Sequence, residues 1–129
     1  MIYIAGPLFS EAQREFLEKI DSICGKLKFK TFLPHRDAGI CDGKNEDEVF
    51  KRDLEALDKC SLVVANITLS EADAGTCWEI GYSYAKNIPI MGLIDDIRFD
   101  KTNFDLMLNK SVKIVRNLKE LEDELSKVK

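Results

Sequence analysis

Blocks of apolar residues alternate with polar segments along the chain, and five of these blocks have the pattern of buried strands. Each is short and apolar, several are rich in β-branched residues, and polar residues or glycine and proline lie beside them. The clearest example runs from Ser61 to Ile67. The expected strands are residues 1–5, 29–33, 61–67, 87–94 and 112–115.

Between these strands, apolar residues repeat at the three- and four-residue spacing of amphipathic helices. The first helix is expected to begin at Ser10, because Ser10 and Gln13 have the S-x-x-Q form of a capping box. Asp73 and Thr76 are both suitable caps for a later helix. The expected helices are residues 10–27, residues 46–59 and a segment from residue 73 onward, followed by a short turn at 104–108 and a final helix after Asn117.

Strands that alternate with helices predict an α/β fold with a parallel sheet and right-handed crossovers. Five such units fit a doubly wound, flavodoxin-like sheet of order 2-1-3-4-5 in a single domain spanning residues 1–129. Ligands of such folds bind at the crevice where the strand order reverses, beyond the carboxyl ends of strands one and three. The segments that meet there are Gly6 to Phe9 and Asn66 to Glu79, which makes Gly6, Phe9 and Asn66 candidate binding residues.

Composition favours a small-molecule ligand over a polymer or a membrane. The 129 residues carry a net charge of -4 without a basic cluster, so we expect neither a nucleic-acid polymer nor an anionic membrane surface as partner. The four cysteines show no C-x-x-C spacing and have only His35 to join them, which argues against zinc and against a disulfide framework. With no secretory signal or apolar membrane span in sight, we expect a cytoplasmic protein with reduced thiols. The cysteines are Cys24, Cys41, Cys60 and Cys77.

Three carboxylates stand out because of their surroundings. Asp53 falls within the apolar stripe of its helix, where an ionised carboxylate is costly unless it is paired, so it either joins a structural network or lines a polar cavity. Asp73 and Glu79 flank a helix start at which Gly75 lets the backbone approach a ligand closely. The alternative is that Asp73 and Glu79 only complement the dipole of a surface helix.

The polar segment from Pro34 to Asp47 has no periodicity and is long for a loop in a compact domain. Such loops often cover or contact a ligand, so His35, Arg36 and Asp37 are candidates for touching substrate. An ordinary surface loop is an equally good interpretation for any one of them.

Several familiar ligand classes of this fold are excluded by the residues present. The first strand is followed by Ala5-Gly6-Pro7 rather than an acidic pair, so a phospho-receiver domain does not fit. Neither G-x-x-x-x-G-K-[ST] nor G-x-G-x-x-G occurs, and a single histidine makes a Ser-His-Asp triad implausible. Carboxylates beside Tyr3 and an aromatic ring at Phe9 or Trp78 instead suit glycosyl chemistry, in which one acid stabilises the sugar cation and another protonates the leaving group.

Two motifs resemble those of the nucleoside 2-deoxyribosyltransferases and of the related hydrolases that cleave 2'-deoxynucleoside 5'-monophosphates. Residues 3–9 are similar to the opening Tyr-x-x-Gly-x-x-Phe of that family, and residues 73–81 are similar to its signature D-x-G-x-x-x-E-x-G. The resemblance implies that Glu79 is the nucleophile, that Tyr3 orients it and that Asp53 handles the departing base. It also implies that Asp73 holds the sugar hydroxyls and that neither a metal nor an organic cofactor is needed.

The same resemblance implies sites shared between subunits of a homo-oligomer, to which a neighbour contributes the Asn of an Asn-Leu-Met segment. Here Asp105-Leu106-Met107 stands in that place, so the contact falls to Asp105 or to a nearby Asn103 or Asn109.

Three functions remain open at this stage. Deoxyribosyl transfer between bases of unphosphorylated nucleosides is favoured, because an anionic Asp73 repels a 5'-phosphate and the hydrolases have a small hydroxyl residue there. The alternatives are a monophosphate N-glycosidase and a non-catalytic nucleoside- or nucleotide-binding domain.

Overall fold

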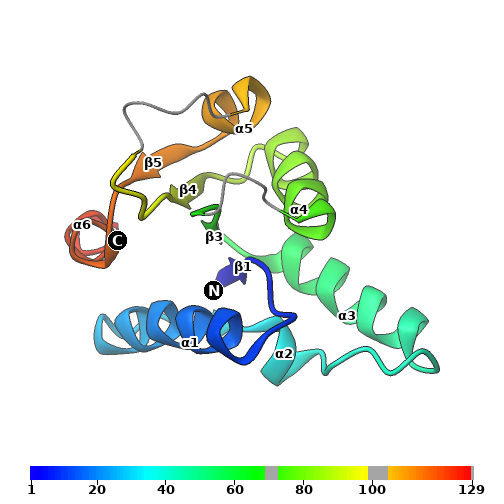
Figure 1. Ribbon diagram of the computed structural model, residues 1–129. Helices are drawn as coiled ribbons and strands as arrows, with labels where there is room; N and C mark the ends of the chain where they lie inside the picture. The colour runs from blue at the N-terminus through cyan, green and yellow to red at the C-terminus, as the bar shows by residue number, and fades with distance from the viewer. Residues whose placement is uncertain (69–72, 99–104, 129) are drawn as a thin grey trace.

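A five-stranded parallel sheet lies at the centre of the computed structural model, which describes residues 1–68, 73–98 and 105–128 (Figure 1). The strand order is β2-β1-β3-β4-β5, and every neighbouring pair is parallel. This confirms the predicted doubly wound, flavodoxin-like fold. The strands are β1 (Ile2–Ala5), β2 (Thr31–Phe32), β3 (Leu62–Asn66), β4 (Ile90–Leu93) and β5 (Lys113–Val115).

Helices cover both faces of the sheet, with α1 and α6 on one side and α3, α4 and α5 on the other (Figure 1). The predicted capping box at Ser10 and Gln13 is confirmed: the Ser10 side chain accepts from Gln13 N, and Gln13 Oε1 accepts from Ser10 N at 3.0 Å. Asn117 likewise caps α6 by accepting from Glu120 N at 2.8 Å. The helices are α1 (Glu11–Lys26), α2 (Pro34–Asp37), α3 (Glu46–Lys59), α4 (Ala74–Ala85), α5 (Leu106–Ser111) and α6 (Leu118–Leu125).

Two hydrophobic cores form because successive side chains of a strand point to opposite faces. In β1, Ile2 and Ile4 join the core under α1 and α6, whereas Tyr3 and Ala5 join the core under α3 and α4. The same strand therefore supplies aliphatic packing to one face and a phenol to the other.

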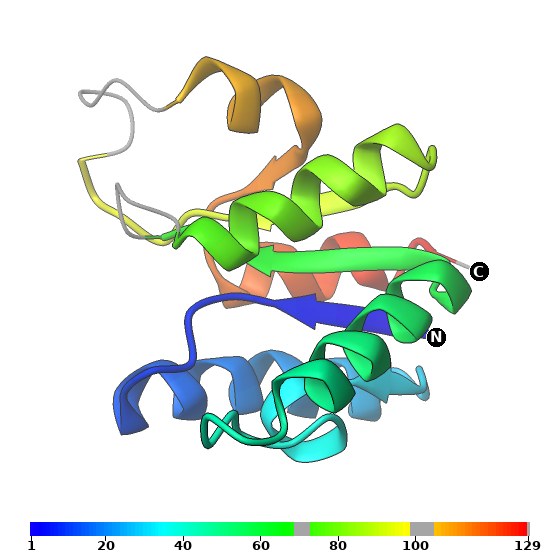
Figure 2. The same cartoon turned by 90° about the vertical axis from the view of Figure 1, so that its right-hand side faces the viewer.

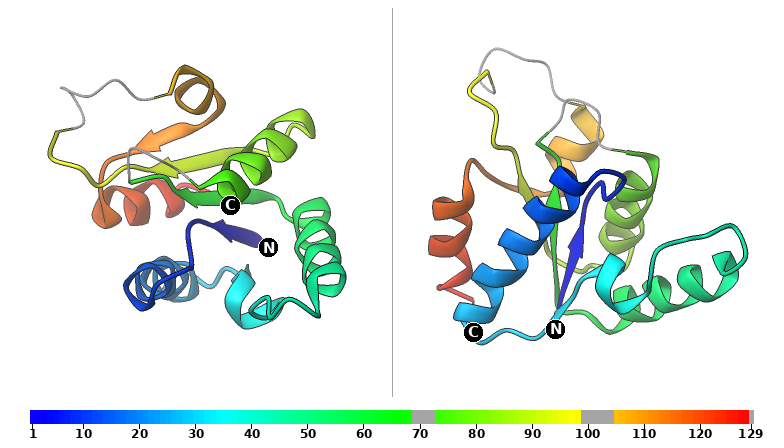
Figure 3. Two further views of the ribbon diagram at one scale, coloured as in Figure 1. Left: turned by 45° about the vertical axis from the view of Figure 1, so that its right-hand side comes forward. Right: turned by 60° about the horizontal axis from the view of Figure 1, so that its bottom comes forward.

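The carboxyl ends of β1 and β3 lie at one edge of the sheet, away from the N terminus (Figure 2). Gly6 follows β1 there, and a Cβ at this position would meet Leu17 Cδ2 at 2.7 Å and Asn66 Cβ at 3.1 Å, so only glycine fits. The start of α3 and the loop before it stand away from the sheet (Figure 3). A pocket lies between α3 and the loop after β1.

The element bounds differ from the sequence predictions mainly at the ends of strands and in the long polar segment. The second and fourth strands are shorter than expected, and residues 34–37 form the helical turn α2, which Pro34 begins. Helix α4 begins immediately after Asp73, which is its N-cap and one of the two caps predicted. Within the described ranges, no helix combines the length and the hydropathy needed to cross a membrane.

Candidate active site

A pocket of about 500 Å³ opens between α3, the start of α4 and the loop after β1. Most of its wall is apolar, and three carboxylates, those of Asp53, Asp73 and Glu79, reach it. No lysine, arginine or histidine is among the described residues that line it. The other lining residues are Gly6, Leu8, Phe9, Pro34, Gly39, Cys41, Val49, Phe50, Leu54, Leu57, Ala74, Gly75 and Trp78.

Glu79 is held at the pocket by a tyrosine from the centre of the sheet. The Tyr3 hydroxyl donates a short hydrogen bond to Glu79 Oε2. Tyr3 is fully buried, and its ring stacks on Phe32 with centroids 5.4 Å apart, so the phenol has a fixed position. The tyrosine therefore restricts how the Glu79 carboxylate can turn.

The protonation of the acids is set mainly by their burial. Burial, together with the nearby charges of Asp53 and Asp73, raises the pKa of Glu79 to about 8, although the hydrogen bond from Tyr3 opposes this rise. Burial alone raises the pKa of Asp53 to about 6. Burial, and next the charge of Glu79, raises the pKa of Tyr3 far above its ordinary value, so Tyr3 stays a donor.

Asp53 has an unsatisfied oxygen inside the protein. Its Oδ1 is buried and has no hydrogen-bond partner, and its side chain lines the pocket. A buried acceptor without a partner is costly, so this oxygen is suited to bind a group that enters the pocket. Of the two interpretations left open by the sequence, the structure supports a cavity, whose wall is mostly apolar around the three carboxylates.

Asp73 is the N-cap of α4, and both of its oxygens are engaged by one residue. Oδ2 accepts from Thr76 N at 3.3 Å, and Oδ1 accepts from the buried Thr76 hydroxyl. A Cβ at Gly75 would approach Asp73 Oδ2 to 3.1 Å. Thr76 is therefore not the cap itself but the residue that fixes the Asp73 carboxylate at the rim of the pocket.

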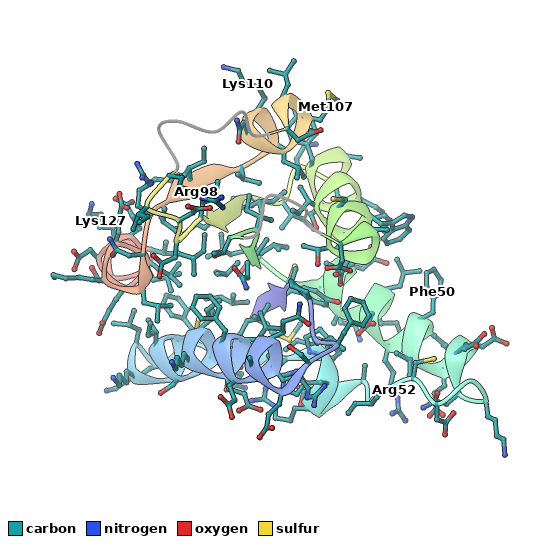
Figure 4. All side chains as sticks on the ribbon, viewed as in Figure 1. Phe50, Arg52, Arg98, Met107, Lys110 and Lys127 are labelled. Atoms are coloured by element: carbon teal, nitrogen blue, oxygen red, sulfur yellow. The ribbon has the colours of Figure 1, made fainter. Side chains whose placement is uncertain are left out.

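An aromatic ladder joins α3 to α4 beside the acids. Phe50 and Trp78 meet edge to face with centroids 5.9 Å apart, and Trp78 stacks on Tyr82 at 5.2 Å with the planes 9° apart. Figure 4 shows Phe50 on the side of α3 that faces α4. The contact ties together the two helices that carry Asp53 and Glu79.

The structure brings most of the predicted site residues together. Gly6, Phe9 and Gly75 line the pocket with the three carboxylates, and Tyr3 lies behind Glu79. Asn66 is not part of it, because its side chain accepts from Thr68 N at 3.2 Å and lines a small hollow on the α1 side of the sheet.

The predicted partner contacts at Asp105 and Asn103 have different outcomes. Asp105 is exposed and caps α5 by accepting from Met107 N at 2.9 Å, so it does not reach the pocket of its own chain. The predicted contact at Asn103 lies outside the described residues.

His35, Arg36 and Asp37, the loop candidates for touching substrate, do not line the pocket of this chain. All three belong to α2, and none lines the pocket. Arg36 Nη1 pairs with Asp21 Oδ2 at 2.9 Å, and His35 Nε2 lies 3.1 Å from Glu18 Oε1. Their polar groups anchor α2 to α1, a role that sequence spacing does not distinguish from ligand binding.

The sequence analysis missed the apolar wall of the pocket. Leu8 and Val49 belong to it, as do Leu54 and Leu57 of the apolar stripe on α3. That stripe was the available signal, since Asp53 within it indicated that this helix face borders a cavity. Over the described ranges, no group of three or more His, Cys, Asp or Glu side chains is placed to hold a metal ion.

Comparisons with solved structures find proteins of the same fold. A conserved protein from Enterococcus faecalis V583 is 26% identical, with a TM-score of 0.80 over 96% of this chain and 95% of that one. A 2-deoxyribosyltransferase from Bacillus psychrosaccharolyticus is 23% identical, with a TM-score of 0.78 over 99% of this chain and 91% of that one. A CMP N-glycosidase from Clostridium botulinum is 18% identical, with a TM-score of 0.65 over 96% of both chains.

At these identities the two enzymes show a shared fold. No curated protein matches the chain in sequence. The model of the family described as nucleoside 2-deoxyribosyltransferase matches residues 2–111, which include Tyr3 and all three carboxylates of the pocket. The family points to an enzyme that is a deoxyribosyltransferase or an N-glycosidase. The chain belongs to the nucleoside 2-deoxyribosyltransferase family.

Proposed function

We propose that this protein transfers the deoxyribosyl group of a 2'-deoxynucleoside from one nucleobase to another. The observation that carries the proposal is the hydrogen bond from the buried Tyr3 hydroxyl to Glu79, in a pocket that Asp53 also lines. The pocket therefore holds an oriented carboxylate and a second acid, which is the pair that glycosyl transfer with retention needs.

Glu79 is the nucleophile in this proposal. Its carboxylate forms a bond to C1' as the bond from C1' to the base nitrogen breaks, and the electron pair of that bond stays with the base. A second base then attacks C1' from the vacated side, gives its N–H proton to the Asp53 carboxylate and releases Glu79. Because Tyr3 restricts one oxygen, the carboxylate is held in one orientation for both steps.

Asp53 supplies the proton that the departing base takes up. With pKa values of about 6 for Asp53 and about 8 for Glu79, the two acids together hold one proton near neutral pH. The reaction needs that state, because one carboxylate must be ionised and the other protonated. In the free protein these values leave the proton on Glu79, so a bound base must draw it to Asp53, whose unpaired Oδ1 is where the base nitrogen would be received.

The charge of the pocket favours unphosphorylated nucleosides over 5'-monophosphates. Three carboxylates line it without a cationic side chain among the described lining residues, and the capped Asp73 stays fixed at its rim. A phosphate dianion would meet repulsion on the order of 1 kcal/mol or more from each nearby carboxylate. Asp73 is instead suited to accept a hydrogen bond from a sugar hydroxyl.

We also propose a homo-oligomer that shares its sites. Asp105 lies outside the pocket of its own chain, so it can contribute only to the pocket of a second copy. Light scattering that showed a fully active monomer of 14.7 kDa would contradict this. The thiols of Cys24, Cys41 and Cys60 form no disulfide, which fits a reducing cytoplasm as the place of the reaction.

The decisive assay is incubation with deoxyadenosine and free cytosine or hypoxanthine, followed by chromatography. Transfer predicts a new deoxynucleoside with the added base. Release of adenine and free deoxyribose, faster from the 5'-monophosphate than from the nucleoside, would instead establish the N-glycosidase. Binding without conversion of either compound would establish a non-catalytic domain.

A further inference from the structure

The aromatic ladder beside the acids has no part in the bond-making steps described above. Phe50 and Trp78 line the pocket, yet 56% of Phe50 and 49% of Trp78 remain exposed. Large apolar rings that stay exposed at the edge of a pocket mark a surface on which something binds.

The ladder is supported from behind. Tyr82 stacks on Trp78, and the Tyr82 hydroxyl donates to Asp58 Oδ1 at 2.5 Å. Lys86 Nζ lies 5.5 Å from the centre of the Tyr82 ring and 3.7 Å from Asp58 Oδ1. The rings are therefore ordered before a ligand arrives, which lowers the entropic cost of binding on them.

The ladder is also placed next to both catalytic acids along the chain. Phe50 is three residues before Asp53, one turn earlier on α3, and Trp78 directly precedes Glu79 on α4. Both rings line the same pocket as the two acids, so a base whose nitrogen reaches Asp53 while C1' reaches Glu79 has this wall within reach. Flat aromatic ligands bind such walls by stacking, and a larger ring system covers more of the wall.

We propose that Phe50 and Trp78 form the stacking surface for the nucleobase, and that this surface holds purines more tightly than pyrimidines. The inference rests on the proposed function, since it concerns the base of the same substrate. It names the residues that set base preference in this chain.

Intrinsic fluorescence tests the inference directly, because Trp78 is the only tryptophan of the chain. The Glu79→Gln variant is titrated with deoxyadenosine and with deoxycytidine, so that neither nucleoside is consumed. We expect saturable quenching of Trp78 emission by both, with deoxyadenosine binding several-fold more tightly. Equal affinity for the two would overturn the purine preference.

Variants separate stacking from a structural role. In the same background, Trp78→Leu should weaken deoxyadenosine binding about ten-fold or more by equilibrium dialysis, and Trp78→Phe should restore most of it. In the otherwise wild-type enzyme, Trp78→Leu should raise KM for deoxyadenosine much more than it lowers kcat. Tyr84→Leu is the matched control, since it removes an exposed ring from the same helix outside this pocket.

The outcomes distinguish this inference from the proposed function. The stacking surface would be overturned, and the transferase left in place, by three results together. The wild-type enzyme would exchange bases, nucleosides would not quench Trp78 emission, and Trp78→Leu would bind deoxyadenosine as tightly as the protein that keeps Trp78. Quenching of Trp78 emission by nucleosides and weaker binding by Trp78→Leu, with no base exchange by the wild-type enzyme, would support the stacking surface and reject the transferase.

Discussion

The two faces of the central sheet are built from the same strands but differ in the chemistry that they bury. Under α1 and α6 the core is almost entirely aliphatic, and Ile2 and Ile4 of β1 belong to it. Under α3 and α4 the same strand contributes Tyr3, and its hydroxyl bonds to Glu79. One face therefore serves stability, and the other gives up some stability to hold acids.

The cost of the second face is visible in its pKa values. Burial raises the pKa of Glu79 to about 8 from an ordinary value of 4.5, so the folded state binds this proton more tightly than the unfolded chain does. Folding is therefore favoured most below pH 4.5, and this advantage is lost as pH rises through about 8, where the folded protein must hold Glu79 as a buried, ionised carboxylate. A functional face can be recognised here because a purely structural core has no reason to keep such a group.

The sharpest way to test the contrast is to neutralise Glu79. Glu79→Gln keeps the size of the side chain but removes the charge that attacks C1', so we expect kcat for base exchange to fall by about 10²-fold or more. Nucleoside binding should persist, as measured by equilibrium dialysis. Near-normal exchange in this variant would show that Glu79 is not the nucleophile.

A substitution in the core under α1 and α6 should change stability alone. Leu121 of α6 is fully buried in the aliphatic core, so Leu121→Ala should lower the free energy of unfolding by about 2–5 kcal/mol in urea denaturation. Exchange per folded molecule should stay at the wild-type rate. A matching loss of kcat in fully folded protein would break the separation of the two faces.

The pH dependence should follow the shared proton of the two acids. Below about pH 6 both carboxyls are protonated and the nucleophile is lost, and above about pH 8 both are ionised and the proton donor is lost. The profile of kcat/KM should be bell-shaped, with a tenfold fall per pH unit beyond each limb. Asp53→Asn should abolish the alkaline limb, and an unchanged profile in that variant would contradict the assignment of the proton.

A smaller effect is expected from the orienting tyrosine. Tyr3→Phe removes one hydrogen bond to Glu79 without changing the core, so we expect exchange to fall about ten-fold, as for a bond of about 1.4 kcal/mol. Ile4→Val, one position along the same strand but on the other face, is the control and should leave exchange per folded molecule unchanged. If the two variants lose activity equally, Tyr3 has only a packing role.

Much of this molecule could be predicted from the sequence because its periodic patterns are strong. The alternation of strands and helices predicted the sheet order, and the position of Asp53 in an apolar stripe left a structural network or a cavity as its two possible surroundings. Less could be predicted where side chains choose between partners. The pairing of Arg36 with Asp21 joins positions far apart in the sequence, so the sequence alone did not reveal that α2 is anchored to α1.

The stacking ladder shows the same limit. Trp78 and Tyr82 are four residues apart on one helix, which sequence spacing predicts as neighbours, but the Phe50 contact depends on how α3 crosses α4. Asn66 does not line the pocket, because its side chain accepts a hydrogen bond from Thr68 N and lines a hollow on the α1 side of the sheet.

The central claim is that Glu79 forms a covalent bond to the sugar, and trapping that bond tests it most directly. A 2'-fluoro-2'-deoxynucleoside destabilises the sugar cation and slows release of the intermediate, so intact-mass spectrometry should show one added glycosyl group per chain. Peptide mapping should place the group on Glu79. An adduct on Asp53 or Asp73, or no adduct in protein that actively exchanges bases, would contradict the account.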